Sequence, residues 1–434
     1  MQWLLVAMCL TVALQHIYSE AFSSIGGVFQ PQLFCKHRPR FIGRNNRLSR
    51  DSEGRILTSK IKSAKSAKKV LAILDKTMNQ PFFNKFHASA AYTSLTAMKR
   101  KGFRQQFGKR SWDSCVLSRL NDRVRTMILE NQLGPREGAN IFWSIVHLRD
   151  LGPIVLQLLG PLVEVLPGHA GSMNTQQLAN CLWAAAHLHE CAPAVVQIVP
   201  AIVSEVPAKA PEMVPQALSN CIWAAAKLQE VAPVLKMVPP VVTEILVNVK
   251  DMIPQALSNC LWAAAQLHEA EPSVLKMVPD IAKCLVANAE GLKPQELSNC
   301  MWAAARLHEA EPSVLQMLPV LVEQVPSKVK QMMPQALSNC FWAASELQEV
   351  EPLVLCMVPG MLPPLLAARS EMSPQELSNS LRAAPKLQDA VPVLQVMPAM
   401  LEQLKEFRCF QWECDEKTFS VDGGREDKNG CMAR

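Results

Sequence analysis

Tryptophan and asparagine recur at fixed positions along the chain, and both side chains carry groups that could bind a ligand. Successive tryptophans stand 39 or 40 residues apart, with an asparagine three residues before each of them. An indole ring can stack on another flat ring, and an amide can both donate and accept hydrogen bonds. The tryptophans are Trp143, Trp183, Trp223, Trp262, Trp302 and Trp342, with Arg382 in the seventh place. The asparagines are Asn140, Asn180, Asn220, Asn259, Asn299, Asn339 and Asn379.

The residue four positions after each tryptophan changes from one repeat to the next. A constant position cannot distinguish one unit of a ligand from its neighbour, whereas a variable polar position can. We therefore expect these residues to be the discriminating contacts to a ligand built of repeating units, at about one unit per repeat. The alternative is that they vary because they only face solvent. They are His147, His187, Lys227, Gln266, Arg306 and Glu346, with Lys386 after Arg382.

A repeated structural unit must present these positions. A period of about 40 residues is typical of solenoids, in which stacked units bury apolar faces that none could bury alone. The clearest copies are PQALSNCLWAAAQLHE (254–269), PQELSNCMWAAARLHE (294–309) and PQALSNCFWAASELQE (334–349). The sequence predicts an all-α fold: a right-handed α-solenoid of about seven two-helix repeats. The first helices of the repeats are expected to line one face and the second helices the other.

The copy at 254–293 shows how one repeat is expected to fold. Pro254 suits the first turn of helix A, which continues without a breaker to Glu269 and stops before Pro272. Helix B follows, and Pro279 either kinks it or separates a short first helix from the rest.

A helical wheel divides helix A into two faces. The face expected to be buried carries Leu257, Cys260, Leu261, Ala264 and Leu267. The opposite stripe carries Asn259, Trp262, Gln266 and Glu269. The residue six positions after the tryptophan, which alternates among Arg, His and Gln, is a less favoured contact.

Cysteine and histidine do not form a catalytic or metal-binding pattern in this chain. Five cysteines stand two positions before tryptophans, and equivalent solenoid helices lie too far apart for disulfides, so we expect free, packed thiols and a reducing compartment. His187 and His189 point to different faces of one helix and cannot share a metal. No phosphate loop or nucleophile elbow is present. We therefore predict no enzyme, no cofactor and no metal site.

The N-terminal residues resemble targeting signals. Residues 1–21 combine a 12-residue apolar stretch with small residues before a possible cut at Phe22, as in a secretory signal peptide. Residues 22–68 form a basic, transit-like segment, because 22–50 contain six Lys and Arg residues and no acid. Together they resemble the bipartite leaders of proteins sent to the plastids of secondary-endosymbiotic algae. We expect a plastid protein, with a mitochondrial presequence or simple secretion as alternatives.

The rest of the chain divides by pattern and by charge. Residues 69–134 are expected to form degenerate helical repeats, 135–400 the tandem repeats, and 401–434 a disordered tail or fragment. No run of 18 apolar residues occurs, so no membrane span is expected in the mature chain. Residues 1–139 carry a net charge of +16, whereas 140–400 carry −8. The repeats are therefore acidic, which disfavours a generic phosphate-binding surface.

The repeat motif P-Q-x-L-[SA]-N-x-x-W-A-x-A-x-L resembles the octotricopeptide-type repeats of organelle RNA-binding proteins. It is also similar to the helical repeats of FAST-kinase-like proteins and of RNA-editing substrate-binding complex proteins. The resemblance covers about 135–400 and implies RNA binding in RNA processing, stability, editing or translation. Such proteins often end in a RAP domain. We recognise none here, so the resemblance implies no nuclease-like activity.

Two functions from different classes therefore remain open. In the first, the protein is an RNA-binding adaptor that holds single-stranded organelle RNA at about one nucleotide per repeat. The tryptophan edges are then surfaces on which bases stack, and other RNA-processing proteins are possible partners. In the second, it is a protein-binding scaffold of HEAT or armadillo type, which the acidic repeats would suit. Whichever function holds, the alternative to a ligand-binding role is that the tryptophans pack between neighbouring helices and the asparagines bridge the stack.

Overall fold

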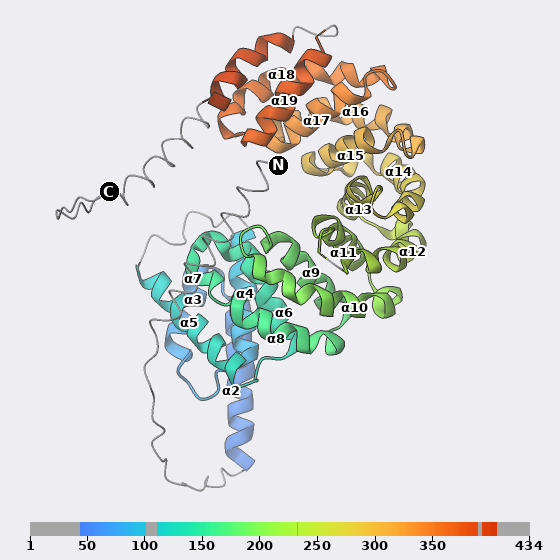
Figure 1. Ribbon diagram of the computed structural model, residues 1–434. Helices are drawn as coiled ribbons and strands as arrows, with labels where there is room; N and C mark the ends of the chain where they lie inside the picture. Colours follow the sequence, from blue (N-terminus) through green and yellow to red (C-terminus); the bar gives the residue numbers. More distant parts are fainter. Residues whose placement is uncertain (1–43, 101–110, 232, 389–392, 406–434) are drawn as a thin grey trace, which may run out of the picture. The chain divides into compact units, whose positions relative to one another are not determined.

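The computed structural model describes residues 44–405 except for 101–110, 232 and 389–392 (Figure 1). The chain divides into two compact units, Met1–Asp51 and Ser52–Arg434, and the second contains all of the repeats. The expected signal peptide, the first part of the transit-like segment up to residue 43, and the expected tail from residue 406 lie outside the described residues.

Helices make up all the regular structure of the described residues, and no strand occurs among them. Eighteen α-helices pack in sequence, each against helices of its own repeat and of the adjacent repeats. This confirms the predicted all-α solenoid of stacked repeats. Its right-handed sense stays a prediction.

The first helix of each repeat belongs to one layer, here called the A layer, in which each helix packs against the A helices before and after it. Figure 1 shows these helices on one side of the repeats, with the second helices, the B layer, on the other. The A layer comprises α4 (Lys85–Arg100), α6 (Pro135–Leu148), α9 (Thr175–Leu188), α11 (Pro215–Lys227), α13 (Pro254–Leu267), α15 (Pro294–Leu307), α17 (Pro334–Leu347) and α19 (Pro374–Lys386). The B layer comprises α8 (Leu159–His169), α10 (Val199–Lys209), α12 (Val238–Asn248), α14 (Val278–Ala287), α16 (Leu318–Lys328) and α18 (Val358–Ala367).

A proline divides the second half of each repeat into two helical pieces. In the type repeat, the 3₁₀ helix η8 (Pro272–Met277) leads into α14, and Pro279 lies in the first turn of α14. Proline has no N–H to donate to a carbonyl one turn back, but the first turn of a helix needs no such bond. Of the two alternatives left by the sequence, the separation of a short first helix is therefore the one observed.

Helix A is buried on more of its surface than the two-face prediction implied. The five residues expected in the core of α13 are all fully buried, which confirms that face. Ala263 and Ala265, which flank Trp262 on the two sides of its stripe around the helix, are fully buried as well. Small side chains here let neighbouring A helices pack closely on both flanks, so only a narrow stripe remains open. Each fully buried leucine adds roughly 1.5–3 kcal/mol to stability.

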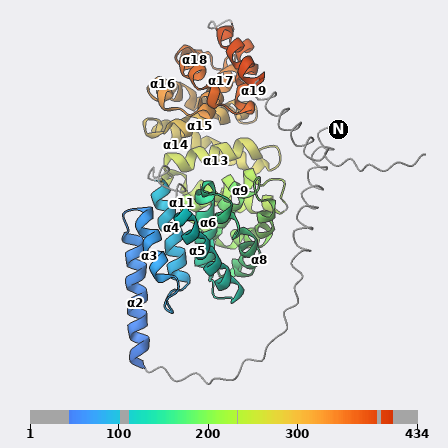
Figure 2. The ribbon, with the colours of Figure 1, turned by 90° about the vertical axis from the view of Figure 1, so that its left-hand side faces the viewer.

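The segment before the first clear repeat is folded into the same unit. It contains the predicted helices on both sides of Pro81 and the one that follows, and α4 occupies an A-layer position beside α6. These helices are α2 (Arg44–Ser63), α3 (Ala67–Thr77), α4 and α5 (Ser111–Leu129), and Figure 2 shows α2 beside α3 and α4. Leu57 and Ile61 of α2 are buried. The folded unit therefore extends further towards the N-terminus than the boundary expected at residue 68.

One stretch, Pro153–Ser172, is long and apolar enough to cross a bilayer by length and composition alone. It comprises α7 (Pro153–Leu156), α8 and the 3₁₀ helix η3 (Ala170–Ser172). Leu162 and Leu166 are fully buried in the repeat core, so part of this apolar surface is used for packing within the repeat. The absence of a membrane partner stays a prediction.

The last A helix departs from the pattern, as expected. Arg382 is exposed where a seventh tryptophan would stand, and its guanidinium donates to Asn379 Oδ1 at 2.7 Å. Pro385 lies within the final turn of α19, which ends one residue later. The tryptophan ladder therefore ends at Trp342.

Candidate ligand-binding face of the A layer

The predicted site residues lie along one stripe of each A helix, here called the A-layer stripe. On α13 it contains Asn259, Trp262 and Gln266, all half-buried, and the exposed Glu269 follows the end of the helix. The stripe recurs on the neighbouring A helices because their sequences repeat. These helices pack against one another in order, which aligns the copies of the stripe. The structure thus brings the predicted residues into rows that run from repeat to repeat.

The six tryptophans form a continuous ladder across the A layer. Centroids of successive rings are 6.5, 6.5, 6.0, 6.2 and 6.2 Å apart, and the planes are inclined by 32–40°. A base inserted between two parallel rings would need a plane separation of roughly twice the 3.4 Å stacking rise. Successive ring centroids in the ladder are closer together than that separation. The ring faces therefore pack within the protein, and the ring edges remain for a ligand.

The variable residue of one repeat lies against the tryptophan of the next. His147 stacks on Trp183 with centroids 5.4 Å apart and planes 28° from parallel. His187 stacks in the same way on Trp223, at 4.6 Å and 27°. Each of these variable side chains is therefore shared between two repeats.

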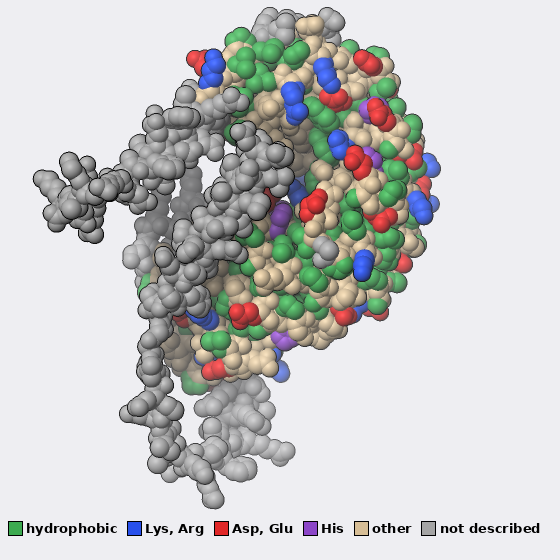
Figure 3. All heavy atoms as spheres, in the orientation of Figure 1, with side chains coloured by type: hydrophobic (Ala, Val, Ile, Leu, Met, Phe, Trp, Pro, Cys, Tyr) green, Lys and Arg blue, Asp and Glu red, His purple; other side chains and the backbone are tan. Residues whose placement is uncertain are grey.

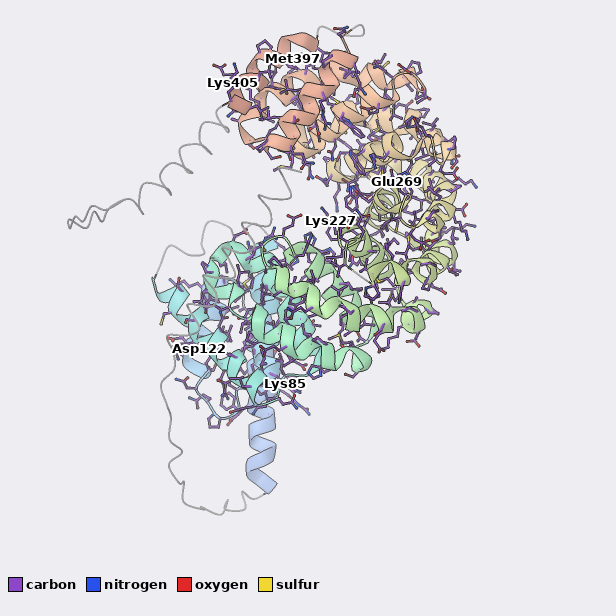
Figure 4. All side chains as sticks on the ribbon, in the orientation of Figure 1. Lys85, Asp122, Lys227, Glu269, Met397 and Lys405 are labelled. Carbon is purple, nitrogen blue, oxygen red and sulfur yellow. The ribbon has the colours of Figure 1, made fainter. Side chains whose placement is uncertain are left out.

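Further along the row, the variable residues make charged contacts. Lys227 Nζ lies 5.4 Å from the Trp262 ring centroid, within the range of a cation–π interaction. Figure 4 shows Lys227 at the end of α11, on the side away from α12. Lys386 Nζ donates to both carboxylate oxygens of Glu346, at 2.9 and 3.0 Å. The first contact leaves a cation available to a ligand, whereas the second neutralises both partners.

The two histidines of the row are neutral at physiological pH. Burial lowers the pKa of His147 to about 4, and Arg100, Lys99 and Arg149 add to the shift. Burial also lowers the pKa of His187 to about 4, helped most among the charges by Arg149. Nε2 of His147 is buried without a hydrogen-bond partner among the described residues. An unpaired buried polar atom costs about 1–3 kcal/mol, so its retention needs an explanation.

The constant asparagines make local bonds where their partners can be identified. Gln216 donates to Asn220 Oδ1 at 3.2 Å, and the same bond recurs on α15 at 3.1 Å. Asn140 donates to the Ser89 hydroxyl of the preceding A helix at 3.3 Å. These bonds serve the fold. A contact between the asparagines and RNA stays a prediction.

The residue six positions after the tryptophan bonds a helix-end carbonyl in five of the repeats, through Arg149, His189, His268, His308 and Gln348. His189 Nδ1 lies 2.9 Å from the carbonyl oxygen three residues before it. Arg149 donates to the His187 carbonyl of the next repeat at 3.0 Å, and Gln348 donates to the Lys386 carbonyl at 2.8 Å. Polar groups here satisfy carbonyls that the end of a helix leaves open. Capping thus accounts for this less favoured position.

Sequence reasoning missed an acidic column beside the stripe. The residue seven positions after each tryptophan, or after Arg382, is always acidic, and this regularity was visible in the sequence. The described members are all exposed and are Asp150, Glu190, Glu230, Glu269, Glu309 and Glu349. They follow the C-terminal ends of A helices, where the helix dipole disfavours negative charge. Helix stability therefore does not explain the column.

The cysteine ladder is buried packing, as predicted. Cys181, Cys221, Cys260, Cys300 and Cys340 are fully buried free thiols. Burial raises the pKa of the Cys221 thiol to about 12 and raises that of Cys260 further. Such thiols are poor nucleophiles and poor metal ligands. A reducing compartment stays a prediction.

The charges outside the stripe form no single dominant patch on the face in Figure 3, where Lys and Arg side chains are interspersed with Asp and Glu. Among the described residues, no three His, Cys, Asp or Glu side chains are placed to hold a metal ion. Comparison of the chain with models of known protein families and with curated proteins gives no match.

Proposed function

We propose that the protein is an organelle-targeted RNA-binding adaptor without catalysis of its own. Its A-layer stripe would hold single-stranded RNA for processing, stability, editing or translation, and partner proteins would supply the chemistry. The observation that carries this proposal is the row of variable side chains, two of which stack on an aromatic ring of the next repeat. Such a row offers a different polar group beside a flat ring at successive positions.

The repeat spacing on the stripe suits an unstacked strand. Successive tryptophan centroids are 6.0–6.5 Å apart, whereas stacked bases rise by roughly 3.4 Å. One nucleotide per repeat therefore requires about a two-fold extension of the strand. Unstacked bases expose the edges that donors and acceptors can distinguish.

The acidic column gives the bound strand a preferred placement. From α11 onward, phosphates are repelled from the C-terminal ends of the A helices, where Glu230 and Glu269 are exposed. The N-terminal ends carry exposed glutamines, such as Gln216 and Gln295, together with the positive ends of the helix dipoles. In these repeats the RNA backbone would therefore run along the glutamines, with its bases over the tryptophan edges and the variable row.

Localisation and family belong to the same proposal. The repeat motif resembles those of organelle RNA-binding proteins, and the leader composition favours a plastid, with a mitochondrion as the alternative. A fluorescent fusion of residues 1–70 tests this, and cytosolic or secreted fluorescence would contradict it.

The acidic column favours a second candidate, a HEAT- or armadillo-like scaffold for a basic protein segment. Six exposed carboxylates line one edge of the stripe; Asp150 already pairs with Lys99 at 2.8 Å and Glu269 lies 3.9 Å from Arg306, so the other four are the main candidates for binding a basic ligand. A peptide rich in lysine and arginine would neutralise them while its apolar parts lie on the tryptophans. The two candidates predict ligands of opposite charge.

Binding of the full chain to a labelled single-stranded RNA pool distinguishes them. We expect an affinity that falls steeply between about 50 and 200 mM salt. The variant Lys227→Glu with Arg306→Glu should bind several-fold more weakly. Lys250→Glu with Lys330→Glu, which changes the charge equally at exposed positions after B helices, should bind as the wild type does. Crosslinking that recovers protein but no RNA would favour the scaffold.

A further inference from the structure

An open pocket of about 540 Å³ lies at the N-terminal end of the tryptophan ladder. It is formed by α4, α6, the 3₁₀ helix η2 (Arg149–Leu151) and α9, so it spans the degenerate repeat and the first two clear ones. The side chains that matter here are Lys99, Arg100, His147, Arg149, Trp183 and His187. This combination of cations and aromatic rings occurs where the variable row begins.

The charges around the pocket leave two guanidinium groups in excess. Lys99 Nζ lies 2.8 Å from an Asp150 carboxylate oxygen and 2.6 Å from the His147 carbonyl, so lysine and aspartate neutralise each other. Arg149 Nε is 4.0 Å from the same carboxylate group. Arg100 is exposed and makes no ion pair within the part of the chain that the structure describes. The local charge is therefore positive, although the repeats as a whole are acidic.

The remaining wall of the pocket is aromatic and uncharged. Trp183 lies between His147 and His187, with ring centroids 5.4 and 4.0 Å away. Because both imidazoles are neutral, they add no charge and can donate or accept hydrogen bonds at their open edges. His147 Nε2 is the buried nitrogen left without a partner.

We propose that this pocket binds the phosphate of one nucleotide, held by Arg100 and Arg149, with its base against the edges of Trp183 and His187. Guanidinium groups match phosphate oxygens in a two-bond geometry, and aromatic groups accept any base. The inference rests on the proposed RNA-binding function and deepens it, because an anchored nucleotide fixes the register of the strand on the repeats. The opposite end of the row lacks this feature, since Glu346 and Lys386 neutralise each other there.

The phosphate could be a terminal monoester or an internal diester of the strand. The test uses the full chain and one short single-stranded RNA in three forms: 5′-phosphorylated, 3′-phosphorylated and unphosphorylated. The variants are Arg100→Gln and Arg149→Gln. Arg125→Gln is the matched control, because Arg125 is an exposed arginine of α5 outside the pocket. Thermal melting checks that each variant is folded.

If the pocket binds a terminal phosphate monoester, one of the two phosphorylated RNAs should bind about ten-fold more tightly than the unphosphorylated RNA. Arg100→Gln should abolish that difference. If the pocket binds an internal phosphodiester, all three RNAs should bind with equal affinity. Arg100→Gln should then weaken the binding of each RNA equally and reduce the salt dependence of binding by about one phosphate contact. Arg125→Gln should bind as the wild type does in either case. The inference is overturned if both pocket variants bind every form like the wild type, while the proposed function stands.

Adenosine monophosphate provides a test of the pocket that does not depend on RNA binding. Its titration should quench tryptophan fluorescence in the wild type and in Arg125→Gln, and much less in Arg100→Gln. Quenching without any affinity for the longer RNA would support the pocket and contradict the proposed function. Equal quenching in all three proteins would contradict the proposal that Arg100 holds a nucleotide phosphate in this pocket.

Discussion

The imidazole of His187 stacks on the indole of Trp223, which belongs to the next repeat, with centroids 4.6 Å apart and planes 27° from parallel. A variable residue is therefore part of two repeats at once. Its substitution changes both the group offered to a ligand and the surroundings of the following tryptophan. If the row reads bases, each base faces a pair of neighbouring repeats rather than one repeat alone.

Exchanging Lys227 and Glu346 tests whether the row reads sequence. The double variant Lys227→Glu with Glu346→Lys keeps the net charge and reverses the polarity at two positions. We expect the RNA sequences selected from a random pool to change at those positions, because donors and an acceptor have exchanged places. Glu346→Gln alone controls for loss of the ion pair with Lys386. Unchanged selection with full affinity would mean that these residues only face solvent.

The ladder should contribute to stability most strongly in its middle. Trp262 contacts a tryptophan on each side, at 6.0 and 6.2 Å. Trp262→Ala removes both contacts and a half-buried ring, which should cost about 2–3 kcal/mol and lower the melting temperature by several degrees. Arg382→Ala is the control, because that exposed side chain stands beyond the ladder and should cost less than about 0.5 kcal/mol. Equal melting temperatures for the two variants would contradict a structural role for the ladder.

Stability should fall as the pH drops from about 6.5 towards 4. His147 and His187 have a pKa of about 4 in the folded protein, whereas an unfolded histidine titrates near 6.5. Below pH 6.5 the unfolded chain therefore binds protons that the folded chain does not, and folding weakens. After allowance for solvent screening, each histidine should account for about 1 kcal/mol between pH 7 and pH 4.5. Melting at the two pH values measures this loss.

The variant His147→Gln with His187→Gln isolates the contribution of these two residues. It keeps every carboxylate, so acid should still destabilise it, but by less than the wild type. A loss on acidification as large as that of the wild type would show that the two rings do not resist protonation in the folded protein.

The sequence predicted the fold well because the signal was repeated. The tryptophan period and the apolar pattern of helix A gave the repeats, and Leu257 and Cys260 lie in the core as expected. The contacts between side chains of neighbouring repeats could not be predicted from the pattern within one repeat. Nothing in the local sequence shows that His187 meets Trp223. The basic pocket was missed for the same reason, since Arg100 and His187 are far apart in the chain and meet only through the stacking of α4, α6 and α9.

The acidic column provides the clearest separation of the two candidate functions. Removing three adjacent charges, with Glu230→Gln, Glu269→Gln and Glu309→Gln, leaves the shape of the surface unchanged. If RNA is the ligand, its affinity should rise several-fold, because the repulsion between these carboxylates and the phosphates is lost. If a basic segment is the ligand, affinity for a lysine- and arginine-rich peptide should fall instead.

The same three-residue change on the B layer controls for net charge. Glu205, Glu244 and Glu323 belong to α10, α12 and α16, so their replacement by Gln alters the total charge equally without altering the stripe. A rise in RNA affinity confined to the first variant would show that the RNA lies on the A-layer stripe, close enough to the acidic column to be repelled by it. An equal rise in both variants would indicate only the loss of long-range repulsion. A fall in peptide affinity confined to the first variant, with no change for RNA, would make the A-layer stripe the binding face of a protein scaffold.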